Sequence, residues 1–141
     1  SMDAFLVGCP SIGGNPVDAS GNWFDPARAG SGYSVQLHPG YEFFAAFIYD
    51  DLGLPRFLAA ERGGAFNAGA NTIALDQLQG FAPLGAYAAP TRTTIGTLNR
   101  SYGTSTINTL EANATFVNGV PGSWSESASV SPLGGTQGCT P

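Results

Sequence analysis

Apolar and polar residues alternate with a period of two along much of this chain, and this pattern restricts its fold more than any other feature. The alternation is clear in Tyr33–His38, and in residues 123–130 every second residue is a serine. Such alternation is typical of a β-strand with one face in the core and the other in solvent. No window of a dozen residues repeats apolar positions with the helical period without an intervening Gly or Pro. We therefore expect an all-β chain.

Turn-forming residues divide the chain into segments of strand length. The 141 residues include 20 Gly and 10 Pro, and turns are marked by Pro39-Gly40, by Asp50–Gly53 and by Asn118-Gly119. Strands that recur about every 8–12 residues are typical of antiparallel barrels and sandwiches. We predict a single domain over residues 1–141, a small antiparallel β-barrel of about eight strands, with a β-sandwich as the alternative. The expected strands are 33–38, 41–49, 54–60, 72–78, 93–98, 103–110, 113–117 and 122–130.

The charge balance of the chain excludes several classes of partner. Ten Asp and Glu residues stand against five Arg and no Lys, which gives a net charge of -5. A nucleic-acid-binding surface needs a basic patch, so we expect no nucleic-acid partner. No apolar run approaches the roughly 18–20 residues of a membrane-spanning helix, and we expect no membrane span.

The two cysteines, Cys9 and Cys139, stand near opposite ends of the sequence, and neither belongs to a C-x-x-C pair. A bridge between them would stabilise the fold by about 5 kcal/mol in the chain-entropy model. Together with the low charge, this placement predicts a disulfide and a secreted or periplasmic location. We expect Ser1-Met2 to be an expression remnant in front of a mature domain. The alternatives are two buried thiols, or Cys9 as the lipidated residue of the box Leu6–Cys9.

The segment Gly21–Tyr33, GNWFDPARAGSGY, predicts a short strand, an Asp-Pro turn and a glycine-permitted bend into the next strand. Asp25 is expected to accept backbone N–H bonds across the turn, and Trp23 is expected to anchor the core. The segment is similar to a motif of bacterial secreted or envelope proteins of unassigned function, G-x-W-[FY]-[DN]-P-x(3)-G-x-G. In those proteins Y-D-x-x-G-x-P follows, which corresponds here to Tyr49–Pro55.

This resemblance covers residues 21–58, and it implies a compact extracytoplasmic β domain without implying a reaction. The tryptophan that these proteins usually carry two residues after the last proline is Phe57 here. The G-x-W sequence also resembles the first strand of lipocalins and avidins. However, no arginine follows Arg100 to cover the tryptophan as in lipocalins, and Trp124 is the single further tryptophan, where avidins use several.

Catalytic and metal-binding motifs have little support in the sequence. His38 is the single histidine and precedes a turn, and no G-x-S-x-G elbow is present. Asp50-Asp51 lacks the remaining ligand positions of a calcium loop and is interpreted as an ordinary turn. We therefore expect no metal, no cofactor and no assigned catalytic residue.

Residues 122–130 carry the strongest signal for a ligand site. The serine face is expected to be solvated, which would point Trp124 and Glu126 into the barrel. A carboxylate among aromatic rings suits a neutral, hydroxyl-bearing ligand better than an anion. One alternative is a structural role, with Glu126 hydrogen-bonded inside the fold or paired with one of the five arginines. Another is glycoside hydrolysis by Glu126 with Glu111 or Asp76, because that reaction needs two carboxyl groups.

The strand 41–49 is apolar on both faces, with Tyr41, Phe43, Phe47 and Tyr49 on the odd-numbered face. We expect this face to pack in the core; the alternatives are a ligand-stacking surface and an interface between copies of the chain.

We interpret the chain as a non-catalytic binding module for a small neutral ligand such as a carbohydrate, with Trp23, Trp124, Glu126, Tyr41 and Tyr49 as ligand-binding residues. A structural or protein-interaction domain, with homo-oligomers formed through the strand 41–49, is the first alternative. An enzyme resembling glycoside hydrolases is the second.

Overall fold

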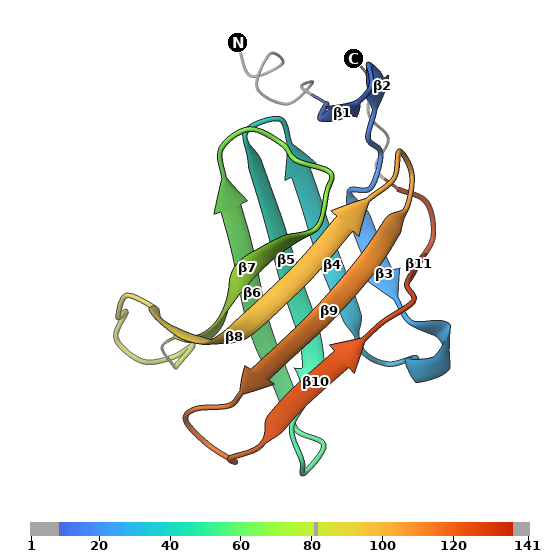
Figure 1. Ribbon diagram of the computed structural model, residues 1–141. Coiled ribbons are helices and arrows are strands. Elements are labelled where there is room, and N and C mark those ends of the chain that lie inside the picture. The colour runs from blue at the N-terminus through green and yellow to red at the C-terminus, as the bar shows by residue number, and fades with distance from the viewer. Residues whose placement is uncertain (1–8, 81, 137–141) are drawn as a thin grey trace.

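The computed structural model describes residues 9–80 and 82–136. It confirms the predicted fold class, because nine strands form one antiparallel sheet that curls into a half-barrel (Figure 1). The order of strands in the sheet is β10-β9-β8-β7-β6-β5-β4-β3-β11, so consecutive strands are neighbours from β3 to β10. The strands of this sheet are β3 Gly21–Phe24, β4 Gly32–His38, β5 Tyr41–Tyr49, β6 Pro55–Gly63, β7 Asn71–Gln79, β8 Thr91–Tyr102, β9 Ile107–Thr115, β10 Ser123–Ser127 and β11 Ser131–Pro132.

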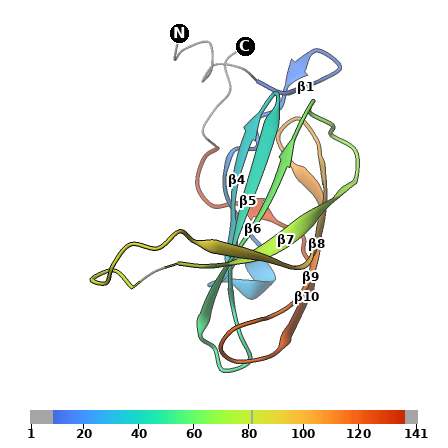
Figure 2. The same ribbon diagram turned by 90° about the vertical axis from the view of Figure 1, so that its left-hand side faces the viewer.

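Two shorter features complete the described secondary structure. β1 (Ser11–Ile12) and β2 (Asn15–Pro16) form a separate two-stranded ladder, and a 3₁₀ turn, η1 (Pro26–Arg28), joins β3 to β4. The β7–β8 hairpin extends away from the rest of the sheet (Figure 2). Among the described residues no helix has the length and apolarity needed to cross a membrane.

The two edge strands of the sheet, β10 and β11, are consecutive in the chain. β10 pairs with β9, and the Ala128 N–H still donates to the Leu110 carbonyl. By Ser131 the chain has changed partner and pairs with β3. The single strand predicted over 122–130 therefore ends at Ser127, because the chain crosses from one edge of the half-barrel to the other. This crossing brings the two edges close together beside β3.

The strands predicted over 103–110 and 113–117 are one strand, β9. The turn that precedes it lies at residues 103–106, where the Gly103 N–H donates to the Thr106 carbonyl. Glu111 and Asn113 are exposed on the outer face, while Ala112 and Ala114 are buried on the inner face. Ordinary alternation thus continues through Glu111 and Ala112, so the predicted break between the two strands is wrong.

The core fills the concave side of the sheet. Its largest fully buried apolar side chains are Phe44, Leu58, Leu75, Leu98 and Leu110, which lie on five different strands. Burial of each of these side chains contributes roughly 1.5–3 kcal/mol. Trp23 is also buried, as predicted for an anchor, and its indole Nε1–H donates to the Ala19 carbonyl at 2.9 Å.

A buried ion pair between Glu42 on β5 and Arg100 on β8 crosses the core. The Arg100 guanidinium donates to Glu42 through Nε at 2.9 Å and through a second nitrogen, and it reaches the Gly69 carbonyl at 2.6 Å. The Tyr102 hydroxyl donates to the same carboxylate at 2.8 Å. Burial, together with the charge of Glu42, raises the pKa of Tyr102 above its ordinary value, so this hydroxyl stays protonated as a donor.

The disulfide prediction rests on Cys139, which lies outside the described residues, as do Ser1-Met2 and most of the Leu6–Cys9 box. The disulfide therefore stays a prediction.

Candidate functional site

The turn between β3 and β4 forms one side of the candidate site. Asp25 caps this turn, because its carboxylate accepts the Ala27 N–H at 2.9 Å, and Pro26 occupies the first position of η1. Gly30 has a φ of +106°, a conformation that favours glycine. The Tyr49 hydroxyl donates to the Gly30 carbonyl at 2.7 Å and so ties the turn to the end of β5. The Asp-Pro turn predicted from the sequence is confirmed.

β10 forms the opposite side of the site. Ser123, Ser125 and Ser127 are exposed, while Trp124 and Glu126 are half-buried on the inner face, as the serine pattern predicted. Glu126 lies opposite Ala112 and Trp124 lies opposite Ala114 in the register with β9. The small alanine side chains leave room above the inner face for the larger Trp and Glu side chains.

Tyr33 on β4 reaches across the half-barrel to Glu126. Its hydroxyl donates to Oε2 of the carboxylate at 2.8 Å. Burial raises the pKa of Tyr33 most strongly, and the negative charges of Glu126 and Asp25 raise it further. The hydroxyl therefore remains a donor at any physiological pH and fixes one oxygen of the carboxylate. Among the described residues no hydrogen bond to the second oxygen is found.

Trp124 and Glu126 meet the turn in a cavity of about 280 Å³, which we call the mouth pocket. It is lined by Arg28, Ala29, Ser31, Ile48, Tyr49, Trp124 and Glu126. The structure thus brings together three of the five predicted ligand-binding residues. Sequence reasoning missed Arg28, because this residue occupies a variable position of the motif and carries no signal of its own. It also missed Tyr33, although alternation in Tyr33–His38 places this residue on an apolar face.

The other two predicted ligand-binding residues do not line the mouth pocket. Trp23 is buried in the core and lines a second cavity, described below, whereas Tyr41 points to the outer side of the sheet, where its hydroxyl donates to Glu61. The core packing expected for the odd-numbered face of β5 is wrong, because this face is the convex side of the sheet and no second layer covers it within residues 9–80 and 82–136. Phe47 and Tyr49 are each 49% exposed, and Phe47 lies against Phe57 with ring centroids 5.4 Å apart.

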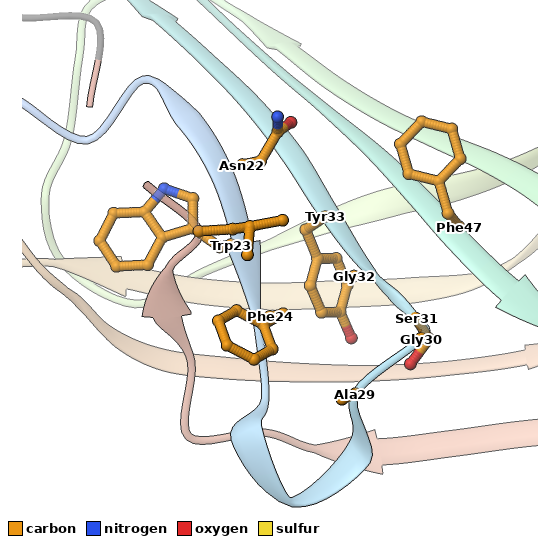
Figure 3. Close-up of a pocket in the computed structure, with 10 residues that line it drawn as sticks. Asn22, Trp23, Phe24, Ala29, Gly30, Ser31, Gly32, Tyr33 and Phe47 are labelled. Carbon is orange, nitrogen blue, oxygen red and sulfur yellow. The ribbon is translucent and has the colours of Figure 1, made fainter. Parts of the chain in front are cut away.

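A second and larger cavity, of about 570 Å³, lies on the outer side of the turn (Figure 3). We call it the outer slot. Phe24 and Phe47 stand on either side of it with Gly32 between them, and Asn22, Trp23 and Leu133 are also among its lining residues. The outer slot and the mouth pocket share Ala29 and Ser31 as lining residues, so they flank the same turn.

The carboxylates expected to assist Glu126 in hydrolysis lie on the outer face. Asp76 is paired there with Arg92 and accepts the Thr94 hydroxyl at 2.8 Å. Glu111 is exposed on β9, on the opposite side of the sheet from Glu126. Neither residue lines the mouth pocket.

The residues considered for metal binding or nucleophilic catalysis take part in strand pairing and in turns. His38 ends β4 and pairs with Tyr41 across the Pro39-Gly40 turn. Asp50 is buried and accepts the N–H groups of Leu52 and Leu54 at 3.0 Å each. Over residues 9–80 and 82–136 no group of three or more His, Cys, Asp and Glu side chains is arranged to hold a metal ion.

Comparison with protein-family models, with curated proteins and with solved structures finds no match to this chain.

Proposed function

We propose that the protein is a non-catalytic binding module whose mouth pocket holds one unit of a neutral saccharide. The observation that carries this proposal is one small cavity lined by the half-buried Glu126, by the exposed Arg28 and by two aromatic residues, Trp124 and Tyr49. Its volume of about 280 Å³ lies just below the roughly 300–1,000 Å³ of pockets for drug-sized ligands, which favours a small occupant.

The charges around the pocket select the chemistry of the ligand. Glu126 would repel an anion, and the net charge of -5 would disfavour its approach. Arg28 would repel a cation from the same cavity. A purely apolar ligand would strip water from both charged groups and offer them no hydrogen bonds, which is costly. A neutral ligand with several hydroxyl groups satisfies both, because its O–H groups donate to Glu126 and its oxygens accept from Arg28.

The aromatic side chains supply the remaining contact. Trp124 and Tyr49 present large, partly exposed rings, whose faces suit the C–H groups of a pyranose. Tyr33 prepares the site by holding one oxygen of Glu126 at 2.8 Å, so that the other oxygen is oriented before the ligand arrives. This fixed carboxylate reduces the entropy that binding must overcome.

The setting of the module belongs to the same proposal. We infer that it works outside the cytoplasm, secreted or in a periplasm, with Cys9 and Cys139 joined as a disulfide. The low charge and the terminal placement of the cysteines support this setting.

The experiment is a ligand-observed NMR screen followed by titration calorimetry. The panel contains glucose, galactose, mannose, N-acetylglucosamine and xylose, with gluconate, glucosamine, octanoate and free phenylalanine as comparators. At least one neutral sugar should bind with a Kd near 1 mM or tighter, which corresponds to about -4 kcal/mol. Trp124→Ala and Glu126→Gln should each weaken binding about tenfold or more, whereas Ser125→Ala, on the exposed face of the same strand, should leave it unchanged.

Two results would contradict the proposal. Absence of binding by every neutral sugar of the panel would remove its basis. Preferential binding of octanoate or phenylalanine would show that the pocket selects an apolar or zwitterionic ligand instead.

A further inference from the structure

The outer slot owes its shape to the absence of a side chain at Gly32. Gly32 pairs with Phe47 on β5, and a Cβ atom at this position would lie 3.6 Å from the Phe24 Cβ. The same Cβ would approach the Trp23 carbonyl oxygen to 2.7 Å, which a side chain cannot do without displacing backbone. Phe24 and Phe47 therefore lie on the two strands that flank Gly32, where β4 carries no side chain (Figure 3).

The spacing of the strands sets the width of this gap. Neighbouring strands lie about 4.8 Å apart, so β3 and β5, with β4 between them, are separated by roughly 9.6 Å. A ring in van der Waals contact with an aromatic face on each side needs about 7–8 Å between those faces. The gap between Phe24 and Phe47 thus accepts one ring.

The lining of the slot restricts the occupant further. None of its lining residues carries a charge. Asn22, exposed at the rim, offers one acceptor and one donor group, and Ser31 adds a hydroxyl. A neutral ring with hydroxyl groups at its edge matches this combination.

The slot continues the mouth pocket. Both cavities are lined by Ala29 and Ser31, and the Tyr49 hydroxyl holds Gly30, the residue between these two, at 2.7 Å. The turn therefore lies between the two cavities and is held in place by Tyr49. A chain of sugar units that begins at Glu126 would cross this turn to place a further unit in the slot.

We propose that the outer slot is a second subsite for the same neutral saccharide, so that the ligand of this protein is an oligosaccharide and not a single sugar. This inference rests on the proposed function of the mouth pocket. In this arrangement one pyranose ring lies between Phe24 and Phe47, and the other end of the same oligosaccharide contacts Trp124 and Glu126.

The test is titration calorimetry with β-1,4-linked oligomers of glucose and of N-acetylglucosamine, each from one to four units. Affinity should rise with length by about tenfold in total for the series that binds. Phe47→Ala and Phe24→Ala should flatten this rise, since the loss of one stacked ring weakens binding roughly two- to tenfold. Both variants should bind the monosaccharide as the parent does. Tyr41→Ala, an exposed aromatic at the other end of β5, is the matched control and should keep the full rise.

The outcomes separate the two proposals. If the monosaccharide binds through Trp124 and Glu126 but longer oligomers bind no more tightly, the second subsite is refuted and the mouth pocket stands. If length increases affinity equally in the parent and in Phe47→Ala, the slot is also excluded. If the parent self-associates without sugar and Phe47→Ala does not, a second copy of the chain occupies the slot and the inference is overturned. If no oligomer or monosaccharide binds, the proposed function itself fails.

Discussion

Breaking the buried ion pair between Arg100 and Glu42 is expected to be the most destabilising single change of charge in this fold. Arg100 is 0% exposed and Glu42 is 2% exposed, so neither charge can return to water when its partner is removed. In Arg100→Met, the carboxylate keeps the Tyr102 hydroxyl and a distant contact to Arg62 at 3.9 Å. Loss of one partner from a buried pair costs about 3–5 kcal/mol.

The double variant Glu42→Leu/Arg100→Met should be more stable than either single variant. It removes both charges of the pair from the core, and what remains there is the Tyr102 hydroxyl and the Gly69 carbonyl without their partners, at about 1–3 kcal/mol each. Part of that cost is offset by the two apolar side chains that replace the pair. The control is Arg62→Met, which should cost less than about 1 kcal/mol because Arg62 is partly exposed and lies farther from the carboxylate.

The assay is urea unfolding followed by tryptophan fluorescence, with the coupling free energy taken from the full double-mutant cycle. The reasoning is refuted if both single variants lose less than about 1 kcal/mol, or if their losses simply add in the double variant.

Three further predictions concern the core, the stability of the fold at low pH and the cysteines. Trp23→Ala should lower the free energy of unfolding by about 3–5 kcal/mol, and Trp23→Phe should lower it less, because Phe empties less volume and mainly leaves the Ala19 carbonyl without its donor. Equal unfolding midpoints for Trp23→Ala and the parent would contradict this. Although burial alone would raise the pKa of Asp50, the backbone N–H groups and the Arg56 guanidinium that it binds hold it below its ordinary value. The stabilisation by Asp50 is thus complete above about pH 4–5 and lost as pH falls further, so the stability gap between the parent and Asp50→Asn should shrink in acid, and a gap independent of pH would be inconsistent with this. Mass spectrometry of the native protein should show Cys9 and Cys139 as a bridge that gains two protons on reduction, and alkylation of both thiols without reductant would exclude it.

Alternation in the sequence predicts which face of a strand is buried where only one face is apolar. The serines of β10 assign Trp124 and Glu126 to the interior in this way. The same reasoning fails on β5, where both faces are apolar and the pattern contains no information about which one the sheet will cover. The exposure of Phe47 follows from the curl of a single sheet, and that curl is a property of the whole topology.

The candidate site was predictable in part for a related reason. Trp124 and Glu126 are two residues apart on one strand, so local alternation suffices to place them together. Tyr33 on β4 donates to Glu126, and Arg28 in the turn before β4 lines the same cavity as Glu126, although both stand about a hundred residues earlier in the chain. Contacts between segments so distant in sequence depend on strand order and register, which a single sequence does not display.

The measurement that tests the central claim most directly uses the two tryptophans of the chain as separate probes. Their indole N–H groups give two signals in a ¹H–¹⁵N correlation spectrum, which Trp23→Phe and Trp124→Phe assign. Because Trp124 lines the mouth pocket, whereas Trp23 lies outside it with its N–H bonded to Ala19, addition of the binding monosaccharide should move the Trp124 signal and leave the Trp23 signal in place. A sugar that binds without moving the Trp124 signal, or that moves the signal of Trp23 alone, would contradict the assignment of the mouth pocket as the binding site.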